Sequence, residues 1–278
     1  MPNFICQTCG TQYPESSHPP ESCPICLDDR QWVRWEGQAW TTRQELAQTH
    51  STRIQQEDEA IYGIGTEPGF AIAQRPLLLQ RKEGNILWDC MSFLDESALE
   101  KIRKLGGLTA IAISHPHFFS SMVDWSEAFG GIPIYLHEAH RKHVVRPSSK
   151  IRYWSGDRYS LADDLTLIRV GGHFTGSTVL HWSKAAGGKG GLFPGDSIRV
   201  ANDRNWLCFM YSYVNFIPLS PSRVEAIGDI LEPYSFDRLY GYWFDHNVMS
   251  EAKEKLRRSI KRYCRFISTE APTTDVLP

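Results

Sequence analysis

The sequence has no long hydrophobic run. Its apolar stretches fall well short of the ~18 residues that a membrane-spanning helix needs. The segment from Met1 to Phe4 contains neither a cluster of basic side chains nor an apolar run, so we expect no secretory signal. These absences predict a protein that has no membrane partner and that works in the cytoplasm.

An excess of charge of either sign is also missing. The 278 residues carry 30 basic and 32 acidic side chains, which gives a net charge of −2 with neutral histidine. Nucleic-acid binding usually needs a basic face that neutralises phosphates, so we expect no nucleic-acid partner. A hydrophobic content of 41% is ample for one large domain and one small domain. The composition agrees with an enzyme that acts on a small-molecule substrate.

The sequence has only three cysteines outside Cys-x-x-Cys pairs, because four of the seven form two such pairs. The paired residues are Cys6, Cys9, Cys23 and Cys26. Each pair places two thiolates on one tight turn, and two turns supply the four sulfur ligands that a tetrahedral Zn²⁺ accepts. We therefore predict a zinc-ribbon-like module over residues 1–45, in which Zn²⁺ supplies much of the folding free energy. The spacing also resembles, more loosely, rubredoxin-type iron sites. An iron site and disulfides are the alternatives.

The small module is acidic. Over residues 1–45 it has three arginines against six carboxylates, which makes it a poor binder of phosphates. We expect it to pack on the larger domain, to cover part of a pocket or to mediate self-association into a homo-oligomer. Trp32, Trp35 and Trp40 follow the second cysteine pair and are candidates for such a packing surface.

A His-x-His pair follows a short apolar run. The run 108–113 predicts a buried strand, and Ser114, His115, Pro116 and His117 come directly after it. Two histidines one residue apart at the end of a strand can point both imidazoles at one metal ion. An isolated pair of this kind is more often a polar loop whose histidines form hydrogen bonds, so its meaning depends on the rest of the chain.

Three further predicted strands end in residues that can act with this pair. Asp89 follows the run 86–88, His173 follows the run 165–170 and two glycines, and Asp196 follows Leu192, Phe193 and a Pro-Gly step. The order and spacing of these four motifs over residues 60–265 resemble the metallo-β-lactamase-fold superfamily. The resemblance implies an αββα sandwich, two mixed β-sheets flanked by helices. We assign it to residues 61–268, with a linker at 46–60 and a C-terminal tail at 269–278.

The resemblance also implies a ligand set. His115, His117 and His173 would be imidazole ligands of one metal ion, and Asp196 would bind it directly or bridge two ions. Asp89 would support the loop without binding metal. Three imidazoles and a carboxylate suit Zn²⁺ or Fe²⁺.

The sequence departs from the superfamily pattern where a second ion would bind. The usual motif is His-x-His-x-Asp-His, and this chain has Phe119 and Ser120 at the last two positions. Tyr242 stands where a late histidine is expected, with His246 four residues further on as a candidate replacement ligand. We therefore predict a single metal ion, with Asp196 or Tyr242 as the general base or acid.

These residues favour a metal-dependent hydrolase that uses activated water against an ester, thioester or lactone. The alternatives are a mononuclear iron oxidoreductase of the persulfide-dioxygenase type and a binding protein whose site has lost its activity. The aromatic residues of segment 198–219 are expected either to line a pocket or to form core. His137, His140 and His143 are expected on a solvated helix face.

Further periodic segments complete the prediction. Residues 70–73 and 77–80 are predicted to form paired strands, and residues 96–103 and 122–129 to form helices. A last helix is expected to begin at Ser250 and to carry a basic outer face.

Overall fold

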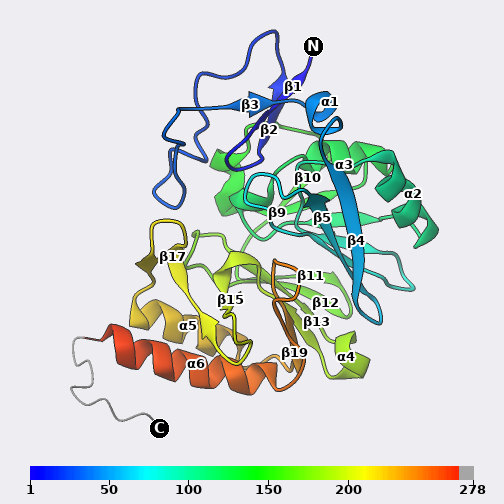
Figure 1. Ribbon diagram of the computed structural model, residues 1–278. Coiled ribbons are helices and arrows are strands. Elements are labelled where there is room, and N and C mark those ends of the chain that lie inside the picture. The colour runs from blue at the N-terminus through cyan, green and yellow to red at the C-terminus, as the bar shows by residue number, and fades with distance from the viewer. Residues whose placement is uncertain (269–278) are drawn as a thin grey trace.

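The computed structural model describes residues 1–268, and its main body is a sandwich of two β-sheets (Figure 1). The first sheet has the strand order β10-β9-β8-β7-β6-β5-β4. Its strands are β4 (Ser51–Asp58), β5 (Ile61–Glu67), β6 (Leu77–Leu79), β7 (Ile86–Trp88), β8 (Ala110–Ala112), β9 (Ile134–His137) and β10 (Ile151–Trp154). The strands from β7 to β10 are parallel and the others are antiparallel, so the sheet is mixed.

The second sheet has the order β11-β12-β13-β14-β19-β20, with one parallel pair between β14 and β19. Its strands are β11 (Arg158–Ala162), β12 (Leu165–Arg169), β13 (Thr178–Trp182), β14 (Gly191–Phe193), β19 (Arg238–Tyr240) and β20 (Asn247–Val248). Two small hairpins lie between β14 and β19 along the chain. They are formed by β15 (Arg199–Val200) with β16 (Leu207–Cys208) and by β17 (Met210–Ser212) with β18 (Ile217–Pro218).

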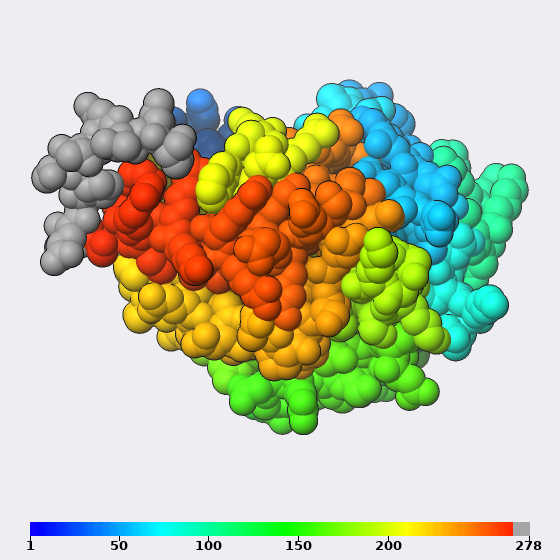
Figure 2. Space-filling view, turned by 90° about the horizontal axis from the view of Figure 1, so that it is seen from below, coloured from blue at the N-terminus to red at the C-terminus, as the bar shows by residue number. Residues whose placement is uncertain are grey.

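Helices cover the outer faces of both sheets (Figure 1). They are α2 (Glu96–Lys104) and α3 (Met122–Ala128) on the first sheet, and α5 (Pro221–Leu231) and α6 (Ala252–Ile267) on the second. Short helical turns complete the chain: η1 (Pro116–Phe118), η2 (Glu138–His143), α4 (Ala185–Gly188) and η3 (Gly195–Ser197). Figure 2 shows α6 lying across one face of the molecule. Among residues 1–268, no helix has both the length and the apolar character to cross a bilayer.

Alternating side chains build the layers of the core. In β6, Leu77 and Leu79 face the space between the two sheets, whereas Leu78 faces α2 and α3. In β8, Ala110 and Ala112 face the second sheet and Ile111 faces the helices. Because successive side chains of a strand point to opposite faces, a fully apolar strand indicates a sheet buried on both sides. The predicted αββα sandwich is thus confirmed.

The N-terminal module forms a separate three-stranded sheet with the order β2-β1-β3, drawn in blue in Figure 1. Its strands are β1 (Asn3–Cys6), β2 (Gln12–Glu15) and β3 (Trp40–Thr41). The short helix α1 (Arg43–Leu46) follows, and a reciprocal capping box between Thr42 and Glu45 fixes its first turn. The module has its own small core around the four cysteines.

The structure differs from the sequence prediction in three segments. Residues 46–60 are not a linker, because 51–58 form the edge strand β4, whose polar residues suit the half-buried edge of a sheet. Residues 70–73 form a turn, in which Ala71 and Ala73 have positive φ, and not the predicted strand. The predicted partner strand, β6, pairs with β5 and β7. Helix α6 is preceded by Glu251 as its N-cap, not by Ser250. The predicted tail, 269–278, lies outside the described residues.

Candidate metal centres

Four buried side chains converge at one end of the sandwich. The group consists of three imidazoles and one carboxylate: His115, His117, His173 and Asp196. Oδ2 of Asp196 lies 3.2 Å from Nε2 of His115 and 3.7 Å from Nδ1 of His117. Nε2 of His173 lies 3.8 Å from the same oxygen and 3.2 Å from Nδ1 of His117. The structure therefore brings together the four residues that we predicted to bind one ion.

The ends of β7 and β8 place the two histidines of the His-x-His pair. Asp89 follows β7 with a φ of +67°, and its Oδ1 accepts a hydrogen bond from the backbone N–H of Ser114 at 2.7 Å. Oγ of Ser114 lies 2.8 Å from Nδ1 of His115. With Nδ1 occupied in this way, Nε2 of His115 is the nitrogen that faces the group. Asp89 thus supports the loop, as its place in the motif implied.

The other two members of the group are held by contacts that are distant in sequence. Nδ1 of His173 donates to the backbone carbonyl of Tyr211 at 2.7 Å, which leaves Nε2 as the free lone pair. The side-chain amide of Gln74 donates to both carboxylate oxygens of Asp196, at 2.7 and 3.0 Å. The hydroxyl of Tyr213 donates to the backbone carbonyl of Asp196 at 2.9 Å. Three of the four ligands, His115, His173 and Asp196, are therefore oriented by a neighbour outside the group before any ion binds.

Burial and mutual contact set the charges of the group. Burial lowers the pKa of His117 to about 4, against the opposing pull of the Asp196 carboxylate. Burial, together with the imidazoles of His115 and His117, lowers the pKa of His173 well below its usual value. Burial would raise the pKa of Asp196, but His115 and His117 outweigh it and hold that pKa far below the ordinary range. Neutral imidazoles and an ionised carboxylate are the states that bind metal.

The donor set fits a metal ion. Among the described residues, Nε2 of His115 has no hydrogen-bond partner although the atom is buried, and a buried polar atom of this kind is costly unless something else satisfies it. It points at the one place where the other three donor atoms meet. Three nitrogens and an oxygen within 4.8 Å of one another suit a single Zn²⁺ or Fe²⁺.

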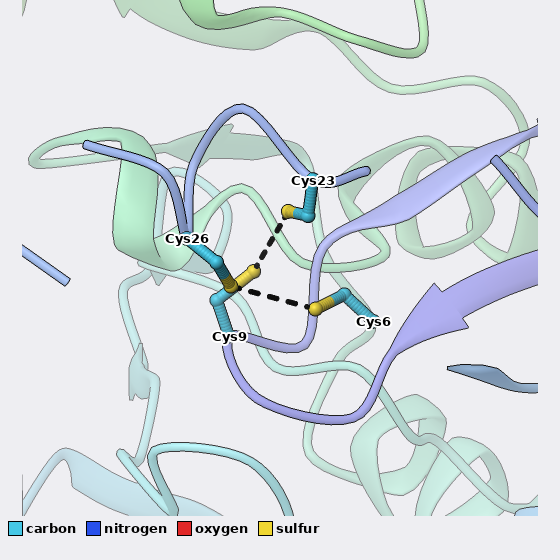
Figure 3. A group of neighbouring side chains, drawn as sticks. All are labelled: Cys6, Cys9, Cys23 and Cys26. Atoms are coloured by element: carbon cyan, nitrogen blue, oxygen red, sulfur yellow. Dashed lines mark hydrogen bonds between the residues drawn. The ribbon is translucent and has the colours of Figure 1, made fainter. Parts of the chain in front are cut away.

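The four paired cysteines form a second group, which has the character of a structural metal site (Figure 3). Sγ of Cys6 lies 3.5 Å from Sγ of Cys26, and Sγ of Cys9 lies 3.6 Å from Sγ of Cys23. A disulfide requires ~2.05 Å, and no cysteine within residues 1–268 is in one. The spacing is that of sulfurs around one tetrahedral ion, so the geometry fits the predicted Cys₄ site.

Two predicted positions lie apart from the histidine group. His246 does not join it: its Nδ1 lies 3.0 Å from the backbone carbonyl of Phe244, within the turn that follows β19. Phe119 is buried in the core beneath α2 and α3, and the backbone carbonyl of Ser120 accepts a hydrogen bond from Gln12 at 3.1 Å. The prediction that His246 binds metal is therefore not supported, and positions 119 and 120 serve packing and the N-terminal module.

A cavity of about 140 Å³ opens onto the histidine group. Tyr242, which we predicted as a catalytic residue, lines it together with residues that the sequence did not single out for the site. These are Arg30 and Gln31 from the N-terminal module, Gln74 from the turn before β6, and Trp243. Gln74 and Arg30 carry no local signal, because their roles arise from contacts across 122 and 143 positions of the chain.

Segment 198–219 is divided between the two expected roles. Arg199 and Tyr213 line the cavity, whereas Phe209 is fully buried in the core beneath α5 and α6. Phe216 is 82% exposed and belongs to neither.

Two other histidines contradict the prediction of a solvated helix face. His137 and His140 are buried, and Nε2 of His140 lies 3.3 Å from the backbone carbonyl of Ser114, next to the His-x-His pair. The turn η2 faces inward because it packs beside β9 and β10 beneath the His173 loop. His140 supports the His-x-His loop from outside the metal-binding group, whereas the ring of His137 bonds to the backbone of Gly156 and Ala139.

Solved structures share this arrangement of sheets and helices. The DIM-1 metallo-β-lactamase is 15% identical with a TM-score of 0.56, and the match covers 77% of this chain and 98% of that one. VMB-1 is 13% identical with a TM-score of 0.55 over the same shares. The metallo-β-lactamase FIM-1 from Pseudomonas aeruginosa, in its mono-zinc form, is 14% identical with a TM-score of 0.53, covering 77% and 96%. The chain therefore has the metallo-β-lactamase fold.

A relative of much higher sequence identity identifies the family to which the chain belongs. YmaE of Bacillus subtilis (strain 168), an uncharacterized protein, is 47% identical over 272 residues, which span 97% of this chain and 98% of that protein. The chain belongs to the same family as YmaE. No family model matches the sequence.

Proposed function

We propose that the protein is a metal-dependent hydrolase with a single catalytic ion. The observation that supports this most directly is the convergence of His115, His117, His173 and Asp196 at the floor of a cavity. The positions where the superfamily pattern would supply ligands for a second ion are used otherwise, since Phe119 packs in the core and Ser120 contacts the N-terminal module. The mono-zinc form of FIM-1 is a precedent for the same fold with one ion.

The ion, when bound, would polarise the substrate carbonyl and lower the pKa of a water molecule towards ~7. Asp196 remains ionised and acts as a ligand, with its carboxylate fixed by Gln74. Both of its carboxylate oxygens already accept from Gln74 and one would bind the ion, so we assign Asp196 no role as general base. The side chains of the cavity then have to orient the substrate and manage the proton.

Tyr242 is our candidate for the general acid. Burial, together with Tyr213 and Asp196, raises the pKa of Tyr242 well above its usual value, so its hydroxyl keeps its proton at neutral pH. A protonated phenol beside the metal group can donate a proton to a leaving oxygen or sulfur, but it cannot start as a base. The sequence had left both roles open to Tyr242, and its surroundings favour the acid.

The cavity walls favour a small ester, thioester or lactone with an apolar or aromatic part and an anionic group. Tyr213, Tyr242 and Trp243 supply the aromatic surface. The guanidinium of Arg199 lies 4.4 Å from the ring centroid of Trp243, where it can attract an anion while stacking on the ring. An oxidoreductase of the persulfide-dioxygenase type is the second candidate, because the same three imidazoles and carboxylate also suit Fe²⁺.

Metal analysis of matched variants tests the proposal. The wild-type protein, purified without added metal, is expected to contain two metal equivalents, one for each group, and to hydrolyse at least one substrate in a broad screen of esters, thioesters and lactones. His115→Ala and His173→Ala are expected to lose one equivalent and the activity. His18→Ala, at an exposed position, is the control and should keep both. Iron in the histidine group would favour the oxidoreductase, and activity that survives loss of that ion would refute the proposed function.

A further inference from the structure

The N-terminal module contacts both loops that carry the metal-binding histidines. Residues 28–31 lie against the loop of His173 and line the same cavity. Elsewhere in the module, Gln12 contacts Ser120, in the segment that follows His117, and Gly10 contacts Ser92, in the loop that follows Asp89. Both parts of the module follow a cysteine pair directly along the chain: Gly10 comes after Cys9, and Asp28 comes two residues after Cys26.

Arg30 makes the most direct of these contacts. Its Nη1 donates to the backbone carbonyl of His173 at 3.1 Å, and its guanidinium carbon lies 3.7 Å from the ring centroid of Phe174. Asp28 pairs with the other edge of the same guanidinium through both carboxylate oxygens. The side chains of Arg30 and Asp28 are 14% and 20% exposed, so this pair is largely shielded from solvent. The carboxylate holds the planar guanidinium in place, and the guanidinium holds the backbone of His173.

The same residue is tied to the segment that orients the ring of His173. Oγ of Ser212 donates to the backbone carbonyl of Arg30 at 3.2 Å. Its neighbour Tyr211 supplies the carbonyl that accepts from Nδ1 of His173. The side-chain amide of Asn215 donates to the carbonyls of Asp29 and Gln31, at 2.9 and 3.1 Å. Residues 28–31 are therefore fastened to the partners that set both the backbone and the ring of one ligand.

A second set of contacts reaches the His-x-His loop. The backbone N–H of Gln12 donates to the carbonyl of Ser120, a residue with a φ of +41° that lies three positions after His117. Oγ of Ser92 donates to the carbonyl of Gly10 at 2.7 Å. The side-chain amide of Gln12 donates to Asp124 in α3 at 2.7 Å. The module thus contacts both histidine-bearing loops.

We propose that the Cys₄ module is part of the histidine metal centre, with Arg30 as a positioning residue for His173. The proposal rests on the proposed metal-binding role of the histidine group, but it does not depend on which reaction occurs there. Removing a side chain that supports a metal ligand typically weakens metal binding 10- to 100-fold. We therefore expect Arg30→Gln to weaken metal binding at the histidine group at least ~10-fold while the Cys₄ site stays loaded.

A cobalt-substituted full-length protein tests this, because the two sites have different spectra. Cobalt bound by thiolates shows intense near-ultraviolet charge-transfer absorption. Both sites absorb in the visible, so the weaker visible bands of the histidine site are obtained by subtracting the spectrum of His173→Ala, in which only the Cys₄ site is loaded. Stepwise addition of a chelator then gives the relative stability of each site in one sample, with no substrate present. Arg34→Gln is the matched control, because Arg34 lies in the same module but contacts Gln7 and Glu36.

The expected result is that Arg30→Gln loses the visible bands of its histidine site at ~10-fold lower chelator concentration than wild type, with the charge-transfer band of the Cys₄ site unchanged. Arg30→Lys should stay weakened, because an ammonium cannot bridge Asp28 and the carbonyl of His173 as the guanidinium does. Ser212→Ala removes one hydrogen bond to Arg30, so its histidine site should also lose cobalt at lower chelator concentration, by a smaller factor. This variant replaces Arg30→Gln in the test if Arg30→Gln does not fold.

If both Arg30→Gln and Ser212→Ala lose the visible bands of the histidine site at the same chelator concentration as wild type, the positioning role is overturned and the proposed function stays intact. A wild-type protein that binds cobalt only through thiolates would overturn both.

Discussion

At the scale of single residues, the site depends on close approach between two strand ends. Gly195, which precedes Asp196, has a φ of +51°, and a Cβ there would lie 2.5 Å from Oγ of Ser114 and 3.6 Å from Nδ1 of His115. Ser114 has no room to yield, because it is buried and its N–H is held by Asp89. A larger residue at 195 must therefore push apart the two loops that carry metal ligands.

Gly195→Ala is expected to lower the free energy of unfolding by ~2–4 kcal/mol, from positive φ and the clash together, and to reduce metal content at the histidine group. Denaturant unfolding and metal analysis measure the two effects. Gly187→Ala is the control, because Gly187 has a φ of +64° but no described atom lies within 4 Å of a Cβ there. Equal losses in the two variants would show that the contact with Ser114 does not matter.

The buried imidazole of His140 makes the stability of the protein depend on pH. Burial lowers the pKa of His140 to about 3, so the folded state keeps this imidazole neutral while the unfolded state takes up a proton below pH ~6.5. The free energy of unfolding therefore falls as the pH drops from 7 to 5, by ~2 kcal/mol from this group. His140→Gln should remove that part of the loss in urea unfolding at the two pH values. The exposed His18→Gln should not, and a wild-type pH dependence in His140→Gln would contradict the account.

At the scale of elements, a buried ion pair joins the edge strand β4 to the end of β19. Arg75 is completely buried and pairs with Glu57 of β4, whose side chain is 4% exposed. Nη2 of Arg75 also donates to the carbonyl of Gly241 at 2.9 Å and to Oδ1 of Asn247 at 2.6 Å. Gly241 precedes Tyr242, so this network positions the candidate general acid.

Arg75→Met is expected to cost ~3–5 kcal/mol of folding free energy, because it leaves Glu57 buried without its partner. The double variant Arg75→Met with Glu57→Leu should recover much of that loss, since no uncompensated charge remains. Thermal and urea unfolding of the three proteins measure this. A double variant that is no more stable than Arg75→Met would show that the hydrogen bonds to Gly241 and Asn247 dominate.

The sequence predicted strands correctly where a short apolar run and the polar residue after it lie next to each other in the chain. Strands that end in Asp89, His115, His173 and Asp196 combine apolar runs with polar ends, and the structure has each of them. It predicted β4 poorly, because an edge strand such as Ser51–Asp58 buries little and so lacks the apolar alternation. It could not predict Gln74 or Arg30, because an amide or a guanidinium acquires its role only from a partner more than 100 positions away.

At the scale of the whole molecule, our proposal joins two candidate metal groups into one centre. The module with the four cysteines contacts both loops that carry the histidines, and the sandwich brings three imidazoles and one carboxylate to a common point. A second ion at the histidine group would need ligands at positions 119 and 120, which the fold has used for packing and for contact with the module. The central claim is therefore one ion in each group.

Native mass spectrometry of the full-length protein tests this claim most directly, because it counts bound ions on intact molecules. The account predicts two ions per chain in wild type and one in His173→Ala, which should keep the ion of the Cys₄ group. Three ions per chain in wild type, or two in His173→Ala, would contradict it.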